Sequence, residues 1–430
     1  MGPGVKFLFV HQNFPGQYLH LLRHLAASGR HELLFLCDDN QNFIQGVRKI
    51  VYRLRRKPGA ATHRNSREFE TAMIRAEAVA EAASQLRHLG FRPDIIIGHH
   101  GWGEMLELCD IWPGVPMLGY FEFFYHTDGL DVGFDPEFPV TPPMLSNIRA
   151  KNGVNLLALS LPGHGQTPTR FQHMTYPDWA RPRISLVPEG ADLALCHPDP
   201  TVARQVFRIK DVEISPRTRL VTYVARDLEP YRGFHVMMRA LPHILAARRD
   251  VEVILVGGDG VSYGVKLAEG SWRDHFIREQ KGRYDAARVH FVGRVDYADY
   301  RQLLRRSDAH VYLTYPFVAS WSLREALASG CAVIGSDTEP VREFIHDGEN
   351  GLLVPFLEPE RIAARVLELL EDLPLARRLR EAARRYAEQH LAMADYLAAM
   401  TGLIERLTGE RAAPGEPASP RVAASGSGSV

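Results

Sequence analysis

The stretch Arg219–Leu241, RLVTYVARDLEPYRGFHVMMRAL, decides the fold of this chain. Residues 219–224 are rich in β-branched and aromatic side chains, which predicts a buried strand. Phe234–Arg248 has the apolar spacing of a helix packed on one face, and Val251–Val256 (VEVILV) is the next strand. A strand, a loop, a helix and a second strand in this order are typical of a parallel α/β sheet.

The N-terminal half has the same pattern. Val5–Val10 (VKFLFV) predicts a buried strand, the loop HQNFPG follows, and a helix begins near Gln17. Asp94–Ile97 predicts a further strand, and the short apolar run Leu156–Ser160 is interpreted as a later strand of the same sheet. The chain therefore predicts two consecutive α/β units, each opened by a strand, a loop and a helix.

Composition shifts set the expected boundaries of these units. Residues 1–196 form the first domain, and the polar, proline-punctuated stretch 197–217 is interpreted as a linker. The second domain covers residues 218–375, and residues 376–408 are expected to be C-terminal helices. The last segment, 409–430, is rich in Pro, Ala, Ser and Gly, which predicts disorder.

Charge and cysteine content exclude several classes of protein. The 430 residues carry 51 basic and 51 acidic side chains, which argues against binding nucleic acid or membranes through bulk positive charge. The four cysteines are widely spaced, and this spacing matches neither a zinc site nor a disulfide framework. With no apolar run long enough for a signal peptide or a spanning helix, we expect a soluble, cytoplasmic protein.

Polar residues follow the predicted strands of the first unit, where parallel sheets bind ligands. Gly16 stands at a helix entrance and would let an anion approach the backbone, although a plain turn glycine is an equal alternative. His99 follows the strand Asp94–Ile97 and is interpreted as a hydrogen-bond partner of a sugar or phosphate oxygen, with a buried structural histidine as the alternative. His11, Asn13 and His126 are expected on the side that would bind the acceptor, the second substrate of a group transfer.

His126 belongs to the aromatic, acidic stretch 121–138 (FEFFYHTDGLDVGFDPEF). This stretch either lines the acceptor side or is an ordered loop that covers a sheet edge, and the sequence does not separate the two.

The loop after the first strand of the second unit carries Arg226 and Arg232. Two guanidinium groups beside one strand end can clamp a diphosphate and neutralise its charge as it departs. The alternative is two exposed arginines with no ligand.

The segment Tyr315–Asp337, YPFVASWSLREALASGCAVIGSD, leads from a loop into a helix expected to begin at Leu323. The backbone amides of Ser320, Trp321 and Ser322 would point at a ligand in front of that helix. Glu325, placed in the first turn, either favours the helix dipole or accepts hydrogen bonds from two ribose hydroxyls.

Two other ligand signals are weak. No G-x-G-x-x-G follows the first strand of either unit, which argues against a nicotinamide dinucleotide. Two aspartates never occur as D-x-D, the pair with which many sugar transferases hold a metal and a diphosphate. We therefore predict no cofactor and no bound metal.

Together these motifs resemble the family 4 retaining glycosyltransferases, whose GT-B fold consists of two facing Rossmann-like domains. The resemblance covers the chain to about residue 407 and is densest over 219–355. The segments that carry it are RLVTYVARDLEPYRGFHVMMRAL, VILVGGDG, VHFVGRV, SDAHVYLTYP, ALASGCAVIGSDTEPVREFIHDGENGLLV, HQNFPGQ and VPEGAD.

The resemblance implies that the first domain binds the acceptor, that the second binds a UDP- or GDP-linked sugar, and that the C-terminal helices cross back to the first. Arg226 and Arg232 would hold the donor diphosphate, with Gly16 near it. Glu325 would hold the ribose, and His99 would touch the donor sugar or orient the transferring centre. Transfer would retain the anomeric configuration and need no metal.

One position departs from the family. Its signature has two glutamates separated by seven residues, and Phe317 stands where the first should be. We therefore keep two alternatives to a hexosyltransferase: a catalytically silent nucleotide-sugar-binding partner protein, and a sugar-nucleotide epimerase or phosphorylase. The acceptor is not readable from the sequence, and a weak peripheral association with a membrane stays open.

Overall fold

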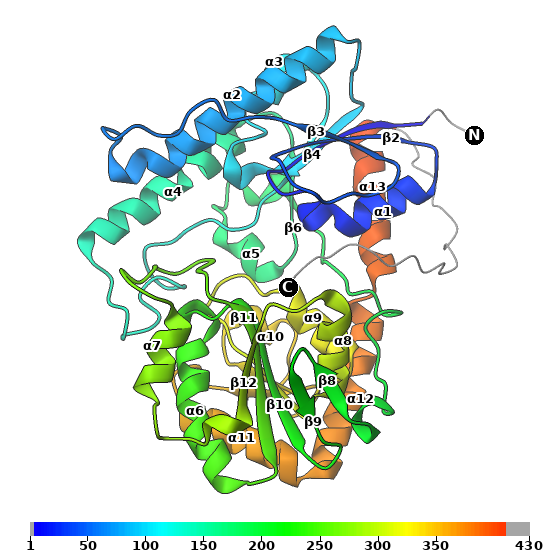
Figure 1. Cartoon of the computed structure of the whole chain (residues 1–430). Helices are drawn as coiled ribbons and strands as arrows, with labels where there is room; N and C mark the ends of the chain where they lie inside the picture. The colour runs from blue at the N-terminus through cyan, green and yellow to red at the C-terminus, as the bar shows by residue number, and fades with distance from the viewer. Residues whose placement is uncertain (1–3, 410–430) are drawn as a thin grey trace. The chain divides into compact units, whose positions relative to one another are not determined.

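The computed structural model describes residues 4–409, which divide into two units (Figure 1). The first comprises the described residues up to Pro188 together with those from Ala394 onward. The second runs from Glu189 to Met393. Apart from Gly409, the predicted disordered segment 409–430 lies outside the described residues.

The first unit is built on a seven-stranded sheet in which every pair of neighbours is parallel. The strand order is β3-β2-β1-β4-β5-β6-β7. Its strands are β1 (Lys6–Val10), β2 (Glu32–Cys37), β3 (Val47–Val51), β4 (Ile95–His99), β5 (Met117–Tyr120), β6 (His164–Thr167) and β7 (Ile184–Leu186). Its helices are α1 (Leu19–Ala27), α2 (Arg67–His88), α3 (Leu108–Ile111), α4 (Pro142–Ser160), α5 (Arg170–Thr175) and α13 (Met393–Thr408).

The run Leu156–Ser160 is not a strand, as the sequence suggested, but the last turn of α4. Short apolar runs are ambiguous between helix and strand, and here the buried Val154 and Ala158, four residues apart, pack as on one helix face. Within residues 4–409, none of the helices is long and apolar enough to cross a bilayer.

The second unit has a six-stranded parallel sheet in the order β12-β11-β10-β13-β14-β15. Its strands are β10 (Arg219–Asp227), β11 (Val251–Gly258), β12 (Val289–Gly293), β13 (Ala309–Tyr312), β14 (Val333–Ser336) and β15 (Leu352–Val354). Its helices are α6 (Phe234–Ala247), α7 (Trp272–Glu279), α8 (Tyr297–Arg306), α9 (Trp321–Ala328), α10 (Glu339–Arg342), α11 (Pro359–Glu371) and α12 (Leu373–His390).

The stretch interpreted as a linker, 197–217, holds an antiparallel hairpin of β8 (Phe207–Ile209) and β9 (Val212–Ile214). Phe207, Ile209 and Ile214 are buried in the core of the second unit, which explains why the hairpin is part of that unit. The chain leaves the first unit after Pro188, before residue 196, where the sequence analysis placed the end of the first domain.

Both sheets confirm the predicted Rossmann-like architecture and share one feature that places ligand sites. The strand order reverses between β1 and β4 in the first unit and between β10 and β13 in the second. In open parallel sheets, ligands bind beyond the carboxyl ends of the strands at this reversal.

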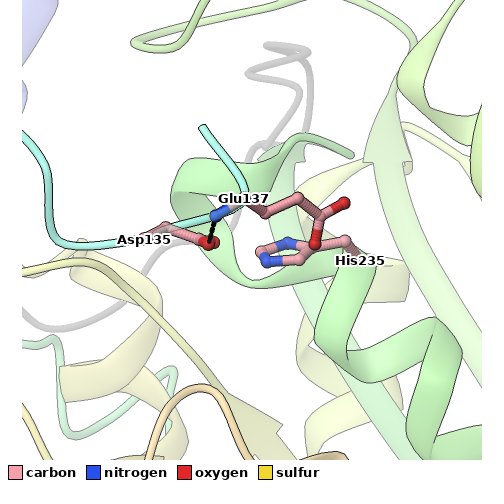
Figure 2. A group of neighbouring side chains, drawn as sticks. All are labelled: Asp135, Glu137 and His235. Atoms are coloured by element: carbon pink, nitrogen blue, oxygen red, sulfur yellow. Dashed lines mark hydrogen bonds between the residues drawn. The ribbon is translucent and has the colours of Figure 1, made fainter. Parts of the chain in front are cut away.

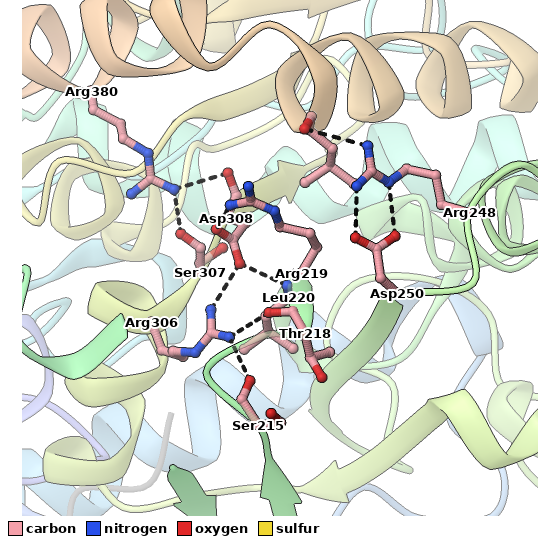
Figure 3. A network of polar contacts seen from close by, with 11 residues as sticks. Ser215, Thr218, Arg219, Leu220, Arg248, Asp250, Arg306, Ser307, Asp308 and Arg380 are labelled. Atoms are coloured by element: carbon pink, nitrogen blue, oxygen red, sulfur yellow. Dashed lines mark hydrogen bonds and ion pairs between the residues drawn. The ribbon is translucent and has the colours of Figure 1, made fainter. Parts of the chain in front are cut away.

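The amino edge of the second sheet is held by arginines (Figure 3). The buried Arg306 donates from Nη1 to Asp308 Oδ2 (2.8 Å) and from Nη2 to the carbonyls of Thr218 (2.6 Å) and Ser215 (3.2 Å). The same Asp308 oxygen accepts the backbone N–H of Leu220 (2.8 Å). These bonds fix the amino ends of β10 and β13 side by side, so that their carboxyl ends also meet.

Candidate functional sites at the two strand reversals

His11 and His99 lie together at the reversal of the first sheet. His11 follows β1 and His99 ends β4, and their ring centroids are 5.6 Å apart at 81°. Both side chains are buried. The structure thus brings two of the predicted site residues into one cluster.

The His99 ring has a defined tautomer. The backbone N–H of Gly101 donates to His99 Nδ1 (2.9 Å), so the neutral ring carries its proton on Nε2. His99 Nε2 lies 3.4 Å from the Glu122 carboxylate. The sequence analysis missed Glu122, although it lies just beyond the carboxyl end of β5.

His11 is uncharged at neutral pH. Burial lowers its pKa to about 3, and Asn13 donates its backbone N–H to His11 Nδ1 (2.8 Å). Gly16 has φ +55°, and a Cβ there would lie 3.0 Å from His11 Nδ1. The backbone conformation and the space that His11 fills therefore both favour glycine at position 16. That an anion approaches the backbone at Gly16 stays a prediction.

The 121–138 stretch is ordered by side-chain contacts. His126 Nε2 donates to the Thr175 carbonyl (2.7 Å), and the Asn152 amide bonds both the N–H and the C=O of Tyr125. These bonds tie the stretch to α4 and α5. That the 121–138 stretch lines an acceptor site stays a prediction.

Farther along this stretch, Asp135 Oδ1 accepts the backbone N–H of Glu137 at 2.9 Å (Figure 2). The third residue drawn there, His235, belongs to α6 of the other unit. We assign no metal site across the two units.

Arg232 lies at the reversal of the second sheet. Its Nη1 donates to Thr314 Oγ1 (2.9 Å) and to the Val318 carbonyl (2.9 Å), both beyond β13. Within residues 4–409, the hydrogen bonds of this guanidinium all come from Nη1, and no carboxylate forms an ion pair with it. A buried arginine thus has Nε and Nη2 protons left for an anion. The next residue, Gly233, has φ +72°, and a Cβ there would lie 2.5 Å from Leu313.

Arg226 is the exposed penultimate residue of β10. In the described part of the chain its side chain makes no hydrogen bond or ion pair. It lies at the carboxyl end of the same strand that leads to Arg232.

The helix that follows β13 differs from the prediction. It begins at Trp321 rather than Leu323, so Glu325 lies in its second turn, and the interpretation of Glu325 as a first-turn dipole partner is wrong. The backbone N–H of Ser320 donates to the Tyr312 hydroxyl (2.8 Å). Of the three predicted amides, those of Trp321 and Ser322 belong to the first turn, where N–H groups have no acceptor within the helix.

Glu325 is held by a hydroxyl group. Tyr297 Oη donates to Glu325 Oε1 (2.7 Å). Burial raises the pKa of Glu325, and the hydrogen bond from Tyr297 opposes that rise. Its binding of a ribose stays a prediction.

Phe317, which replaces the expected glutamate, is 3% exposed. Its ring centroid lies 5.0 Å from that of Tyr263 and 5.7 Å from that of Tyr231. Position 317 is therefore a buried member of an aromatic cluster.

Comparison with known proteins decides the family. Residues 29–196 match the family described as "Glycosyl transferase family 4 group", and residues 206–386 match "Glycosyl transferases group 1". Together the two matches cover about four-fifths of the chain. The two matches support a glycosyltransferase of the family 4 type.

Individual relatives agree with this family. A phosphatidyl-myo-inositol mannosyltransferase of Mycolicibacterium smegmatis is 35% identical over 159 residues, 36% of this chain and 36% of that enzyme. The match thus spans only about a third of that relative. Sucrose-phosphate synthase of Thermosynechococcus elongatus has TM-score 0.71 at 16% identity, over 94% of this chain and 99% of that one. Anabaena HepE in complex with UDP-glucose has TM-score 0.65 at 17% identity, over 94% and 100%. These likenesses confirm the GT-B fold.

The sequence analysis also missed two further glutamates. Glu189, in the VPEGAD motif, accepts the indole N–H of Trp321 (2.7 Å) and lies 3.9 Å from Arg324, so it holds the start of α9. Glu229, two residues past β10, is fully buried. An acidic residue close behind a strand is a signal that could have drawn attention to Glu229.

Proposed function

We propose that this chain transfers a hexosyl group from a nucleoside-diphosphate sugar to an acceptor hydroxyl, with retention of configuration and without a metal ion. The observation that carries the proposal is the buried Arg232 at the reversal of the second sheet, which uses only Nη1 for the protein. A diphosphate has the charge and the acceptor oxygens that such a guanidinium can bind.

In this mechanism the second unit stabilises the leaving group. Arg226, Arg232 and the start of α9 at Ser320–Ser322 would neutralise the departing diphosphate, where negative charge increases most. Glu325 would accept hydrogen bonds from the ribose. The leaving phosphate itself would take the proton of the acceptor hydroxyl, so no protein base is required.

The first unit would serve the acceptor and the transferring centre. His99, with its proton on Nε2, would donate to the donor sugar or orient the centre of transfer. Gly16 would lie near the diphosphate, and His11, Asn13 and His126 would line the acceptor side.

Two relatives guide the choice of substrates. The HepE structure holds UDP-glucose, which favours UDP as the first donor base to test, and GDP is the second. The mycobacterial relative is named for a phosphatidyl-myo-inositol acceptor, which adds lipid-linked polyols to the acceptors to be screened. All four cysteines are free thiols, which suits a cytoplasmic location.

The test begins with donor binding. UDP, GDP, ADP and dTDP are titrated by calorimetry, with EDTA and with Mg²⁺, against the wild type, Arg226→Ala and Arg249→Ala. Arg249 is the matched control, because it is an exposed arginine ahead of β11, at the opposite edge of the sheet. We expect one nucleotide to bind in EDTA, and Arg226→Ala to weaken it several-fold while Arg249→Ala does not.

Transfer is then assayed with the matching nucleotide sugars and an acceptor panel, and the anomer of the product is determined by NMR. No binding of any nucleotide would overturn the proposal, and binding that requires Mg²⁺ would overturn metal independence.

A catalytically silent binding partner is the second candidate, favoured by Phe317 in place of the glutamate. It predicts nucleotide-sugar binding with neither transfer nor donor hydrolysis on any acceptor. Turnover with any acceptor rules it out.

A further inference from the structure

The loop that follows β11 is anchored by a buried carboxylate. Glu229 accepts backbone N–H groups from three consecutive residues of this loop: Ser262 (3.0 Å), Tyr263 (3.3 Å) and Gly264 (2.9 Å). Three amide donors around one carboxylate form an anion nest, here filled by a side chain of the protein itself. The conformation of the loop at Tyr263 therefore depends on Glu229.

A second carboxylate adds to this anchor. Asp227 accepts the Ser262 hydroxyl at Oδ2 (2.6 Å) and pairs through Oδ1 with Arg294 (2.8 Å). Asp227 ends β10 and Glu229 lies two residues beyond it, so the strand that leads to Arg232 also fixes the loop.

The anchored loop places the Tyr263 ring against Arg232. The guanidinium carbon of Arg232 lies 5.0 Å from the centroid of that ring, within the range of a cation–π contact. The Phe317 centroid also lies 5.0 Å from Tyr263. The residue that departs from the family pattern thus supports the ring that contacts Arg232.

We propose that Tyr263 is a positioning residue that orients the Arg232 guanidinium for the donor diphosphate, and that Glu229 in turn positions Tyr263. The inference rests on the proposed function, because it requires that Arg232 binds a diphosphate. Arg232 forms no ion pair or hydrogen bond with a carboxylate among residues 4–409, so the Tyr263 face and the two Nη1 hydrogen bonds are the contacts that orient it. Phe317 is a buttress for Tyr263 and not a ligand of the sugar.

The test compares nucleoside diphosphate with nucleoside monophosphate. Binding of UDP and UMP (or GDP and GMP, if guanosine is the base bound) is measured for the wild type, Tyr263→Ala and Tyr263→Phe. We expect Tyr263→Ala to weaken the diphosphate by roughly three- to thirty-fold, the range of a cation–π contact. The monophosphate should change less than twofold, and Tyr263→Phe should restore diphosphate binding, because it keeps the aromatic face.

A double-mutant cycle isolates the route through Arg232. In an Arg232→Met background, Tyr263→Ala should weaken the diphosphate no further. Glu229→Gln should reproduce the Tyr263→Ala pattern in weaker form, because an amide has one acceptor oxygen for three N–H groups. Glu252→Gln is its control, since Glu252 is half-buried near the amino end of β11 and pairs with His290 (2.7 Å).

Each result decides between the possibilities. If the wild type binds no nucleoside diphosphate, the proposed function and this inference fail together. If the wild type binds and Tyr263→Ala binds equally well, the inference alone is overturned. Equal losses for diphosphate and monophosphate, or additive effects in the Arg232→Met background, would also overturn it, because Tyr263 would then act on the whole site.

Discussion

Two arginines at opposite edges of one sheet, Arg306 and Arg232, are both buried but bonded differently. At the amino edge of the second unit, Arg306 binds Asp308 and two carbonyls through both of its terminal nitrogens. At the carboxyl edge, Arg232 uses one nitrogen and forms no ion pair in the described part of the chain. Removal of one partner from a buried ion pair is strongly destabilising, whereas a buried cation without an ion pair can bind an anionic ligand.

The comparison is tested most strongly by Arg306→Met. Removing one member of a buried ion pair should lower the free energy of unfolding by about 4 kcal/mol, measured by urea denaturation. Arg249→Met, at an exposed site, should change the free energy of unfolding by less than about 0.5 kcal/mol. A loss below about 1 kcal/mol for Arg306→Met would contradict a structural role for this arginine.

Phe317→Glu tests the aromatic cluster beside Arg232. The new carboxylate would be buried beside the rings of Tyr231 and Tyr263, and neither ring offers a positive charge to pair with it. The free energy of unfolding should therefore fall by about 3 kcal/mol. Transfer should not increase, although the family's glutamate is restored. Phe317→Leu, as control, should lose less than half as much stability. Unchanged stability with faster transfer would place position 317 in the donor pocket.

Arg232→Met should show the opposite signature to Arg306→Met. Affinity for the bound nucleoside diphosphate should fall by roughly ten- to a hundredfold, because charge-assisted hydrogen bonds are lost. The free energy of unfolding should change much less than in Arg306→Met. Calorimetry and urea denaturation of the two variants check this prediction. Equal changes of nucleotide affinity and of the free energy of unfolding in Arg232→Met and Arg306→Met would contradict it.

Acid should weaken the fold through the buried His310 of β13. Burial lowers its pKa to about 4, while the unfolded chain has the ordinary value of about 6.5. Between these values the unfolded chain binds the extra proton, so the free energy of unfolding falls as the pH falls, by about 2 kcal/mol at pH 5. His310→Gln should remove this part of the slope, measured as urea stability at pH 7 and pH 5. An identical slope in the variant would show that His310 does not carry it.

The fold was accessible from the sequence because buried parallel strands are nearly continuous apolar runs. Val5–Val10 and Arg219–Val224 were identified for this reason, and the resemblance to family 4 gave the overall architecture. Leu156–Ser160 was misassigned because a run of four apolar residues and a serine satisfies a strand as well as a helix turn, and only packing separates the two.

The candidate sites were predictable where position along a strand decides them. His99, Arg226 and Arg232 follow strands that the topology brings to a reversal. The position of Glu229 behind β10 could have marked it as a candidate, but its role could not be predicted, because that role depends on loop amides more than thirty residues farther along the chain. Tyr263 likewise depends on a ring-to-guanidinium distance that no local pattern encodes.

The path of the chain between the two units has a practical consequence. The second unit is one uninterrupted segment, Glu189–Met393, whereas the first needs α13 from beyond it. Expression of residues 189–393 alone would therefore keep every strand of the six-stranded sheet, but expression of residues 1–188 would omit the buried side chains of α13: Tyr396, Met400, Leu403 and Ile404. A circular permutant that joins α13 to the start of the chain would make the first unit a contiguous gene fragment, suited to ligand screening by NMR.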